Sequence, residues 1–148
     1  MTQRPQIIDP FLANFVERYR ESSPPSARGS VDYLDKLLRR YLDEASRDYP
    51  CAFCRVLLEA ERLLDPEGAF TRVMDLEDLV FMLSDFIHRP WLRDNPLMQR
   101  AQWRFVEALL IAIQSQPMPE CDDLNVRYVH LWKHINWALR GSKAGQRV

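Results

Sequence analysis

Two cysteines one helical turn apart form the local pattern with the clearest chemical potential in this sequence. Cys51 and Cys54 flank Ala52-Phe53 at the predicted start of a helix. The positive end of a helix dipole favours a thiolate, so Cys51 would be suited to nucleophilic disulfide exchange. Free cysteine is also among the most buried residue types, and we predict that Cys51 and Cys54 are reduced and largely buried. A thiol oxidoreductase that uses Cys51 and Cys54 is an alternative interpretation.

A histidine pair offers a second kind of chemistry. His130 and His134 lie one turn apart on a predicted helix, a spacing that zinc and haem ligands use. Two ligands are too few for a structural zinc, and a third would have to come from residues distant in sequence: Cys51, Cys54, Cys121, His88 or Glu107. A pocket near Trp137, His130 and His134 for a small molecule, haem or metal is therefore an alternative, although we expect no metal and no cofactor.

The last two predicted helices carry more apolar residues than one buried face requires. In each helix a second stripe lies on roughly the opposite side, at spacings of three and four residues. Either both helices are covered on two sides, or the second stripes meet a partner, for which tryptophan is a favoured residue type. We expect the second stripes to form a self-association surface, made of Trp103, Val106, Leu110, Val126, His130 and Trp137.

Helix start signals position all of these residues. Asp, Asn or Ser accepts hydrogen bonds from first-turn amides, and proline suits the first helical position. Such residues precede six apolar runs, at Asp9-Pro10, Ser30, Tyr49-Pro50, Asp75, Asn95-Pro96 and Asp122-Asp123. They predict helices over residues 10–20, 31–47, 50–64, 76–87, 96–114 and 124–140. Because no segment alternates apolar and polar residues as a strand does, we expect an all-α fold, a single compact bundle of five to six mostly antiparallel helices.

The length of 148 residues fits one helical domain over 1–148. Within it, residues 10–21 form a short helix that could dock as an arm, and the Ser/Pro-rich residues 22–29 form a linker. We expect residues 142–148 to be a frayed tail.

The composition excludes several partners and leaves interaction as the favoured function. Twenty basic residues face twenty-one acidic ones, so no long-range field attracts nucleic acid or anionic membrane. The longest apolar run, residues 105–113, is far short of a membrane span, and an odd cysteine count without a signal peptide predicts a reducing cytoplasm. No catalytic signature occurs, so we expect a non-enzymatic cytoplasmic interaction or regulatory protein, a homodimer or the small subunit of a larger assembly.

Overall fold

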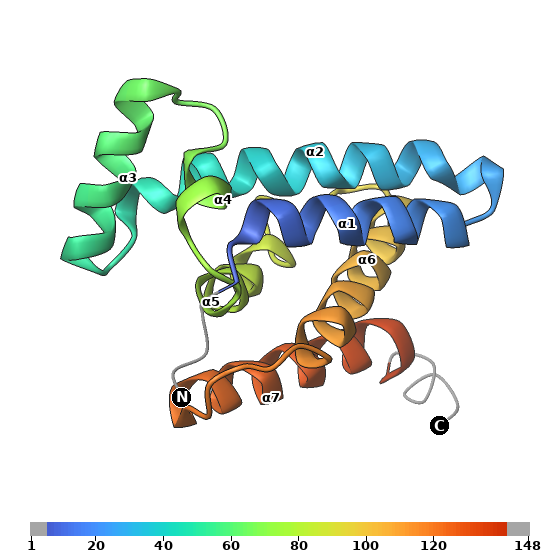
Figure 1. Ribbon diagram of the computed structural model, residues 1–148. Helices are drawn as coiled ribbons and strands as arrows, with labels where there is room; N and C mark the ends of the chain where they lie inside the picture. The colour runs from blue at the N-terminus through green and yellow to red at the C-terminus, as the bar shows by residue number, and fades with distance from the viewer. Residues whose placement is uncertain (1–5, 142–148) are drawn as a thin grey trace. The chain divides into compact units, whose positions relative to one another are not determined.

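The computed structural model describes residues 6–141, and the tail predicted for residues 142–148 lies outside this range. Regular structure between residues 6 and 141 is helical, with no strand, and an isolated bridge joins Ile7 to Asp75 (Figure 1). The all-α prediction is confirmed.

Seven α-helices occur in the described residues, one more than the upper end of the prediction. The additional helix is α4, a five-residue turn of helix that follows Gly68. Each predicted helix begins within three residues of its start signal. The α-helices are α1 Ile8–Ser22, α2 Arg28–Ala45, α3 Ala52–Leu64, α4 Ala69–Val73, α5 Leu76–Phe86, α6 Pro96–Gln114 and α7 Asp122–Asn136; two 3-10 turns, η1 Pro25–Ala27 and η2 Ser46–Asp48, and a π-helical turn, η3 Trp137–Gly141, complete them.

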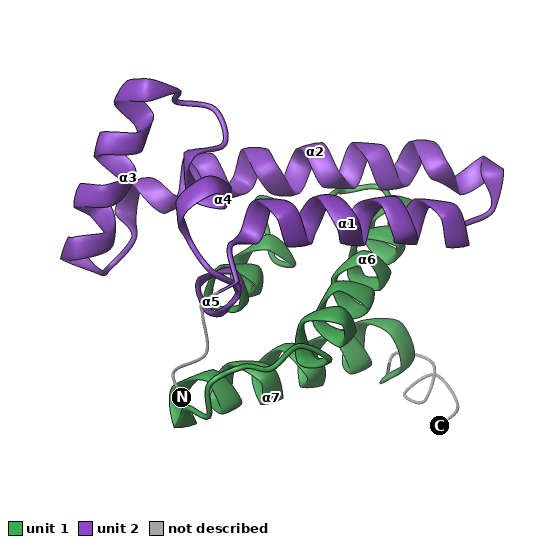
Figure 2. Cartoon of the chain, viewed as in Figure 1, with its two compact units in different colours: residues 1–3, 80–148 green, residues 4–79 purple. Residues whose placement is uncertain are grey.

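The contacts divide the chain into two compact units, one ending at Leu79 and the other beginning at Val80 (Figure 2). The boundary falls inside α5.

In the first unit, α1 and α2 form an antiparallel helical hairpin joined by η1 (Figure 1). The segment predicted as a linker is thus largely this turn. The start of α1 is tied to the end of the unit by backbone hydrogen bonds, from Ile8 N–H to Met74 O at 2.9 Å and from Leu76 N–H to Gln6 O at 3.0 Å.

Helix α2 has one apolar side, and that side is buried. Its buried residues recur at helical spacing, whereas its charged residues face away. The stripe consists of Val31, Leu34, Leu37, Leu38, Tyr41 and Leu42.

In the second unit, local polar contacts fix the start of α6. The Asn95 side chain accepts hydrogen bonds from the N–H groups of Leu97 and Met98, as predicted for a capping asparagine before Pro96. Farther along α6, the buried Gln102 side chain donates to the carbonyl of Phe86 at 2.9 Å and accepts from Arg93 N–H at 3.2 Å. These bonds pair backbone groups of the segment between α5 and α6 that would otherwise be costly to bury.

Candidate functional site

Helix α3 is amphipathic, but it presents its polar side to the rest of its unit. In the described structure only Leu58 of its thirteen residues is buried. Glu61 accepts from Arg72 at 2.7 Å, and Arg62 donates to the hydroxyl of Ser46 at 2.9 Å. Because these ion-pair and hydrogen-bond partners lie on the inner side, α3 is held by polar contacts and one leucine.

The turn after α3 is fixed by charged groups. Arg72 also donates to the carbonyl oxygens of Asp65 and Glu67, and the Asp43 carboxylate of α2 accepts from the N–H of Gly68 at 3.0 Å. Gly68 has a φ of +81°, a conformation in which a side chain would be strained. The turn Asp65-Pro66-Glu67-Gly68 therefore connects α3 to α2 through hydrogen bonds.

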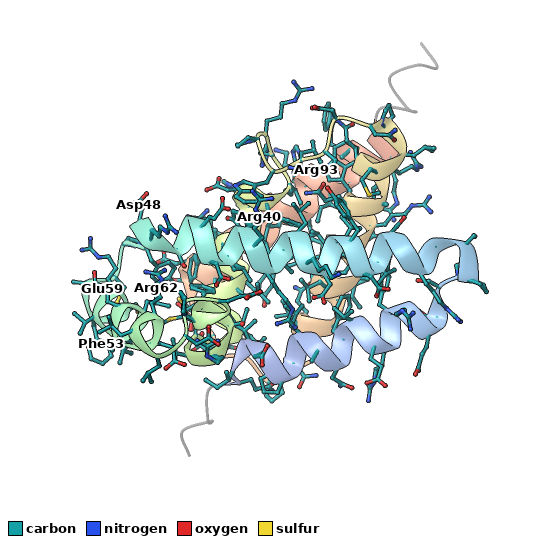
Figure 3. The ribbon with its side chains drawn as sticks, turned by 90° about the horizontal axis from the view of Figure 1, so that it is seen from above. Arg40, Asp48, Phe53, Glu59, Arg62 and Arg93 are labelled. Carbon is teal, nitrogen blue, oxygen red and sulfur yellow. The ribbon has the colours of Figure 1, made fainter. Side chains whose placement is uncertain are left out.

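The outer side of α3 is a continuous apolar face, which we call the α3 face. Its large residues recur every three or four positions along the whole helix, as the seam of a helix pair does. They are Phe53, 71% exposed, Val56, 64%, Leu57, 41%, Leu63, 89%, and Leu64, 82%, with the exposed Ala60 between them. Figure 3 shows Phe53 and Glu59 on the side of α3 away from α2, with Arg62 nearer to α2.

At the first turn of α3 the two cysteines meet. Cys51 is the N-cap residue, and its sulfur accepts a hydrogen bond from the N–H of Cys54 at 3.3 Å. All three cysteines are free, but Cys51 is exposed and Cys54 is half-buried. The prediction that both are largely buried is wrong for Cys51, because α3 turns its apolar side outward and its first turn stands clear of the core.

The two thiols differ in their electrostatic surroundings. The Cys54 thiol and then the Cys54 N–H hydrogen-bond to the Cys51 sulfur and lower the pKa of Cys51 below that of an ordinary thiol. Burial first, and then the proximity of Cys51 and of Asp78, raises the pKa of Cys54. Cys51 is thus the better nucleophile, and Cys54 keeps its proton.

A half-buried acid, Asp78, lies near this turn. Asp75 and Asp78 cap the start of α5 reciprocally, each side chain accepting from the backbone N–H of the other. Asp78 also accepts a hydrogen bond from the hydroxyl of the buried Tyr49. Burial, offset in part by this bond, raises the pKa of Asp78 to about 6.

The predicted self-association residues are not all on the surface. In the α6 stripe Val106 and Leu110 are fully buried, and Trp103 is half-buried. The α7 stripe is open, with Val126, His130 and Trp137 exposed. The structure therefore leaves only the α7 half of that stripe accessible.

The histidine pair is not joined by a metal-binding set. Among residues 6–141 no three His, Cys, Asp or Glu side chains, the named candidates His130, His134, Cys51, Cys54 and Cys121 included, converge as metal ligands. His134 instead lies against His88, with ring centroids 4.3 Å apart, and against Trp137 at 5.8 Å. Burial, and then the proximity of His88, lowers the pKa of His134. Glu107, one of the residues considered as a third ligand, forms an ion pair with Arg140 at 2.8 Å.

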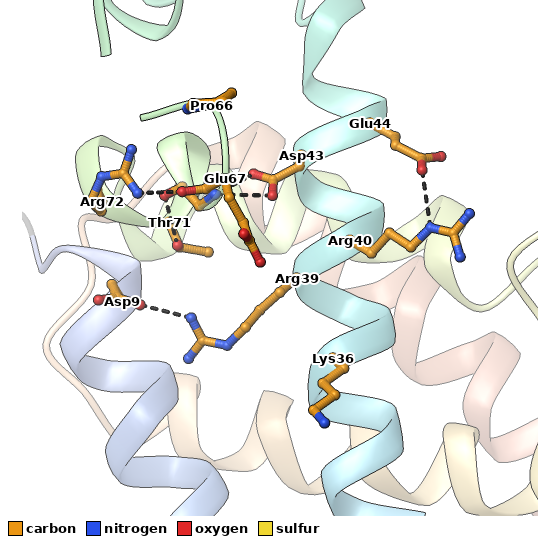
Figure 4. A pocket seen from close by; sticks show the side chains of 11 residues that line it. Asp9, Lys36, Arg39, Arg40, Asp43, Glu44, Pro66, Glu67, Thr71 and Arg72 are labelled. Carbon is orange, nitrogen blue, oxygen red and sulfur yellow. Dashed lines mark hydrogen bonds and ion pairs between the residues drawn. The ribbon is translucent and has the colours of Figure 1, made fainter. Parts of the chain in front are cut away.

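A groove of about 800 Å³ lies between the charged side of α2 and the turn after α3 (Figure 4). Its charges are balanced, with Lys36, Arg39, Arg40 and Arg72 opposite Asp9, Asp43, Glu44 and Glu67. Most are paired, as in Arg39 with Asp9 at 2.7 Å and Arg40 with Glu44 at 3.1 Å. A groove without net charge has no evident preference for a charged ligand.

Sequence reasoning missed the α3 face. The apolar period of residues 50–64 predicts an amphipathic helix, but that period does not say which side the chain covers. The sequence places Glu61 and Arg62 on the less apolar side of this helix, but their contacts with Arg72 and Ser46, which turn that side inward, are visible only in the structure.

Comparison with known protein families finds no match, and neither the curated proteins nor the solved structures include a significantly similar one. In the part of the chain that the structure describes, no helix combines the length and apolar character needed to cross a membrane.

Proposed function

We propose that this chain is an interaction domain that pairs with a second copy of itself through the α3 face. The observation that carries the proposal is the row of exposed apolar residues along the whole of α3. Monomeric proteins rarely expose apolar patches larger than a few hundred Å² unless the patch binds something. The chain would act in the cytoplasm, where its three thiols stay reduced, as a homodimer or as the small subunit of an assembly.

The spacing of the α3 face fits a second copy in antiparallel orientation. A two-fold axis at residue 58, the middle of α3, places Phe53 opposite Leu63 of the other copy and Val56 opposite Ala60. By symmetry each of these two pairs occurs twice and makes four apolar layers, while Leu57 and Leu64 lie opposite Glu59 and Ala52 at the edges of the layers. Such isologous contacts generate closed dimers, the commonest form of oligomer.

The charges beside the α3 face favour the same arrangement. Arg55 and Glu59 are exposed on one flank and have opposite signs. In the antiparallel pair Glu59 of one copy lies opposite Leu57 of the other, at the edge of the apolar layers. It is then two residues, or about 3 Å along the axis, from Arg55 of that copy. The four charged residues of α3, Arg55, Glu59, Arg62 and Glu61, sum to zero, so the helix lacks the basic side of one that binds anionic lipid.

The size of the α3 face is sufficient for a weak or moderate dimer. The face is confined to one helix of thirteen residues, so a dimer formed through it would lie near the lower limit for specific interfaces, about 1,000 Å² in total. Partner contacts from outside α3 would strengthen the pair, and the exposed α7 stripe is the alternative surface.

Measuring the mass in solution by light scattering after size-exclusion chromatography tests the proposal over about a hundredfold range of concentration. We expect the wild type to dimerise and Leu63→Glu to remain a folded monomer, since it places a carboxylate in two layers of the interface. Leu97→Glu is the matched control, because Leu97 is 81% exposed on α6 and lies outside the α3 face.

Two results would contradict the α3 dimer. One is a wild type that stays monomeric over the whole concentration range. Sedimentation of that monomer with phosphatidylserine vesicles would show that the α3 face binds a membrane surface instead of a second copy. The other is dissociation by Trp137→Glu, with Leu63→Glu still dimeric, which would place the contact on the α7 stripe predicted from the sequence.

A further inference from the structure

The first turn of α3 places two cysteines side by side, with different exposures. The Cys51 sulfur is at the surface, on the N-terminal cap, while Cys54 is one turn on and half-buried. The Cys54 N–H points at the Cys51 sulfur, at 3.3 Å. A sulfur that accepts first-turn N–H bonds is held where the helix dipole stabilises negative charge.

The third cysteine provides an internal comparison. Cys121 also occupies an N-cap position, before α7, but its side chain makes no capping hydrogen bond. In the described residues no second cysteine lies within the first turn of α7. Cys51 and Cys121 therefore both lie at a helix start, but in the described residues only Cys51 has a neighbouring thiol and accepts a hydrogen bond from a first-turn N–H.

We infer that Cys51 and Cys54 form a dithiol site that reduces disulfides of small thiols or peptides by thiol–disulfide exchange, with Cys51 as the attacking and Cys54 as the resolving sulfur. This activity goes beyond the proposed interaction and does not depend on it. Cys51 is the N-cap residue of α3 and lies outside the four layers of the α3 face.

The reaction balances without any further reagent. The Cys51 thiolate attacks one sulfur of the substrate disulfide, forms a mixed disulfide and releases the first substrate thiolate. Cys54 then loses its proton to solvent and attacks the Cys51 sulfur, which releases the second thiolate. The protein dithiol is oxidised by two electrons to the Cys51–Cys54 disulfide, and the substrate disulfide is reduced to two thiols.

The electrostatic asymmetry of the pair agrees with these roles. The lowered pKa of Cys51 raises its thiolate fraction at a given pH above that of an ordinary thiol, and the raised pKa of Cys54 keeps the resolving thiol protonated until the mixed disulfide forms. The charged and titratable groups facing the pair are Asp75, Asp78 and Tyr49, and the negative charge of Asp78 acts on both thiols.

Oxidised glutathione is the probe for the test, and acid-quenched mass spectrometry reads the product at each cysteine. In the reduced wild type we expect a Cys51–Cys54 disulfide without retained glutathione, formed at least about tenfold faster than glutathione adds to Cys121. Cys54→Ser should stop at a stable glutathione adduct on Cys51. In Cys51→Ser, modification of Cys54 should be slower by at least the same factor.

Several outcomes would overturn the dithiol site. They are equal rates at Cys51 and Cys121, an unchanged rate at Cys54 in Cys51→Ser, or glutathione retained on the wild-type Cys51 without an internal disulfide. Circular dichroism of each variant checks that the helices are intact. Leu63→Glu should react like the wild type, so that loss of the dimer and loss of the thiol chemistry can be told apart.

Discussion

Helices α2 and α3 belong to the same unit and are both amphipathic, but α2 turns its apolar side inward and α3 turns its apolar side outward. Helix α2 buries six apolar residues and directs its charges outward. Helix α3 buries Leu58, uses Glu61 and Arg62 for inward contacts and exposes the apolar α3 face. An apolar period therefore identifies a helix with two different sides, while the neighbouring partners determine which side the chain itself covers.

The difference has an energetic cost that points to function. Burying an apolar side chain contributes about 1.5–3 kcal/mol, and α3 forgoes most of that gain within the monomer. The free energy of burying the α3 face becomes available only when a partner covers the helix. The buried apolar residues that stabilise the unit are thus concentrated in α2, whereas α3 carries the face for which we propose a partner.

The sharpest way to break this comparison is to place the same charge on each helix. Leu38→Asp in α2 should cost more than about 4 kcal/mol of unfolding free energy, because it buries a carboxylate at a fully covered position. Leu63→Asp in α3, at a position 89% exposed, should change it by less than about 0.5 kcal/mol. Chemical denaturation followed by circular dichroism measures both.

Both values refer to the monomer, so the measurement is made at a concentration below dimer formation. Equal losses for the two variants would mean that α3 is covered by its own chain, and would remove the basis of the α3 face.

The next largest effect concerns the single apolar anchor of α3. Leu58→Ala should destabilise the unit by about 2–4 kcal/mol, through lost burial and the cavity left behind. Since α3 is otherwise held by polar contacts, we expect its amides to exchange with solvent faster than those of α2, as measured by hydrogen exchange. Leu57→Ala, one residue away and 41% exposed, is the matched control and should have little effect; similar exchange in both variants would contradict the anchoring role.

How much the sequence could predict depends on how local the interactions are. Asn95-Pro96 and Asp75 predicted the starts of α6 and α5 because capping bonds join residues two or three positions apart. Helix α4 escaped prediction because five residues contain no full apolar period, and it depends on Gly68 and on Asp43 from α2.

The orientation of α3 depends on contacts that no local pattern contains. Glu61 meets Arg72, eleven residues away, and Arg62 meets Ser46, sixteen residues away. The same limit explains why Cys51 is exposed instead of buried. For α6 the sequence indicated two apolar stripes, and we expected the second to belong to a self-association surface; Val106 and Leu110 of that stripe are buried instead.

The region where α3 begins contains a half-buried acid, Asp78, which has no counterpart among the buried residues of α2, and pH tests this difference. Burial raises the pKa of Asp78 from 3.8 to about 6, so between these values the folded chain binds more protons than the unfolded one. The contribution of Asp78 to stability therefore falls as pH rises from about 4 to about 7. Asp78→Asn, neutral at every pH, should be more stable than the wild type at pH 7 by about 1 kcal/mol after solvent screening.

The advantage of Asp78→Asn should vanish near pH 4. The variant also separates the effect of Asp78 from that of Glu77, because burial raises the pKa of Glu77 as well. Thermal denaturation across this pH range measures the difference, and a difference that does not depend on pH would show that Asp78 is not the titrating group.

The smallest expected effect lies on the charged side of α2. Arg40 is 72% exposed and pairs with Glu44 one turn on, whereas its neighbour Arg39 is 29% exposed and bonds to both Asp9 and Asp35. Exposed pairs contribute little because water already solvates both charges, so Arg40→Glu should change the unfolding free energy by no more than about 0.5 kcal/mol. Arg39→Glu should cost at least about 1 kcal/mol, since it leaves three carboxylates together without their cation. Urea denaturation of the two variants at low and high salt measures the contrast, and salt should reduce the effect at Arg40 further. Equal losses at both positions would mean that α2 is not one-sided, and the contrast with α3 would then rest on the apolar residues alone.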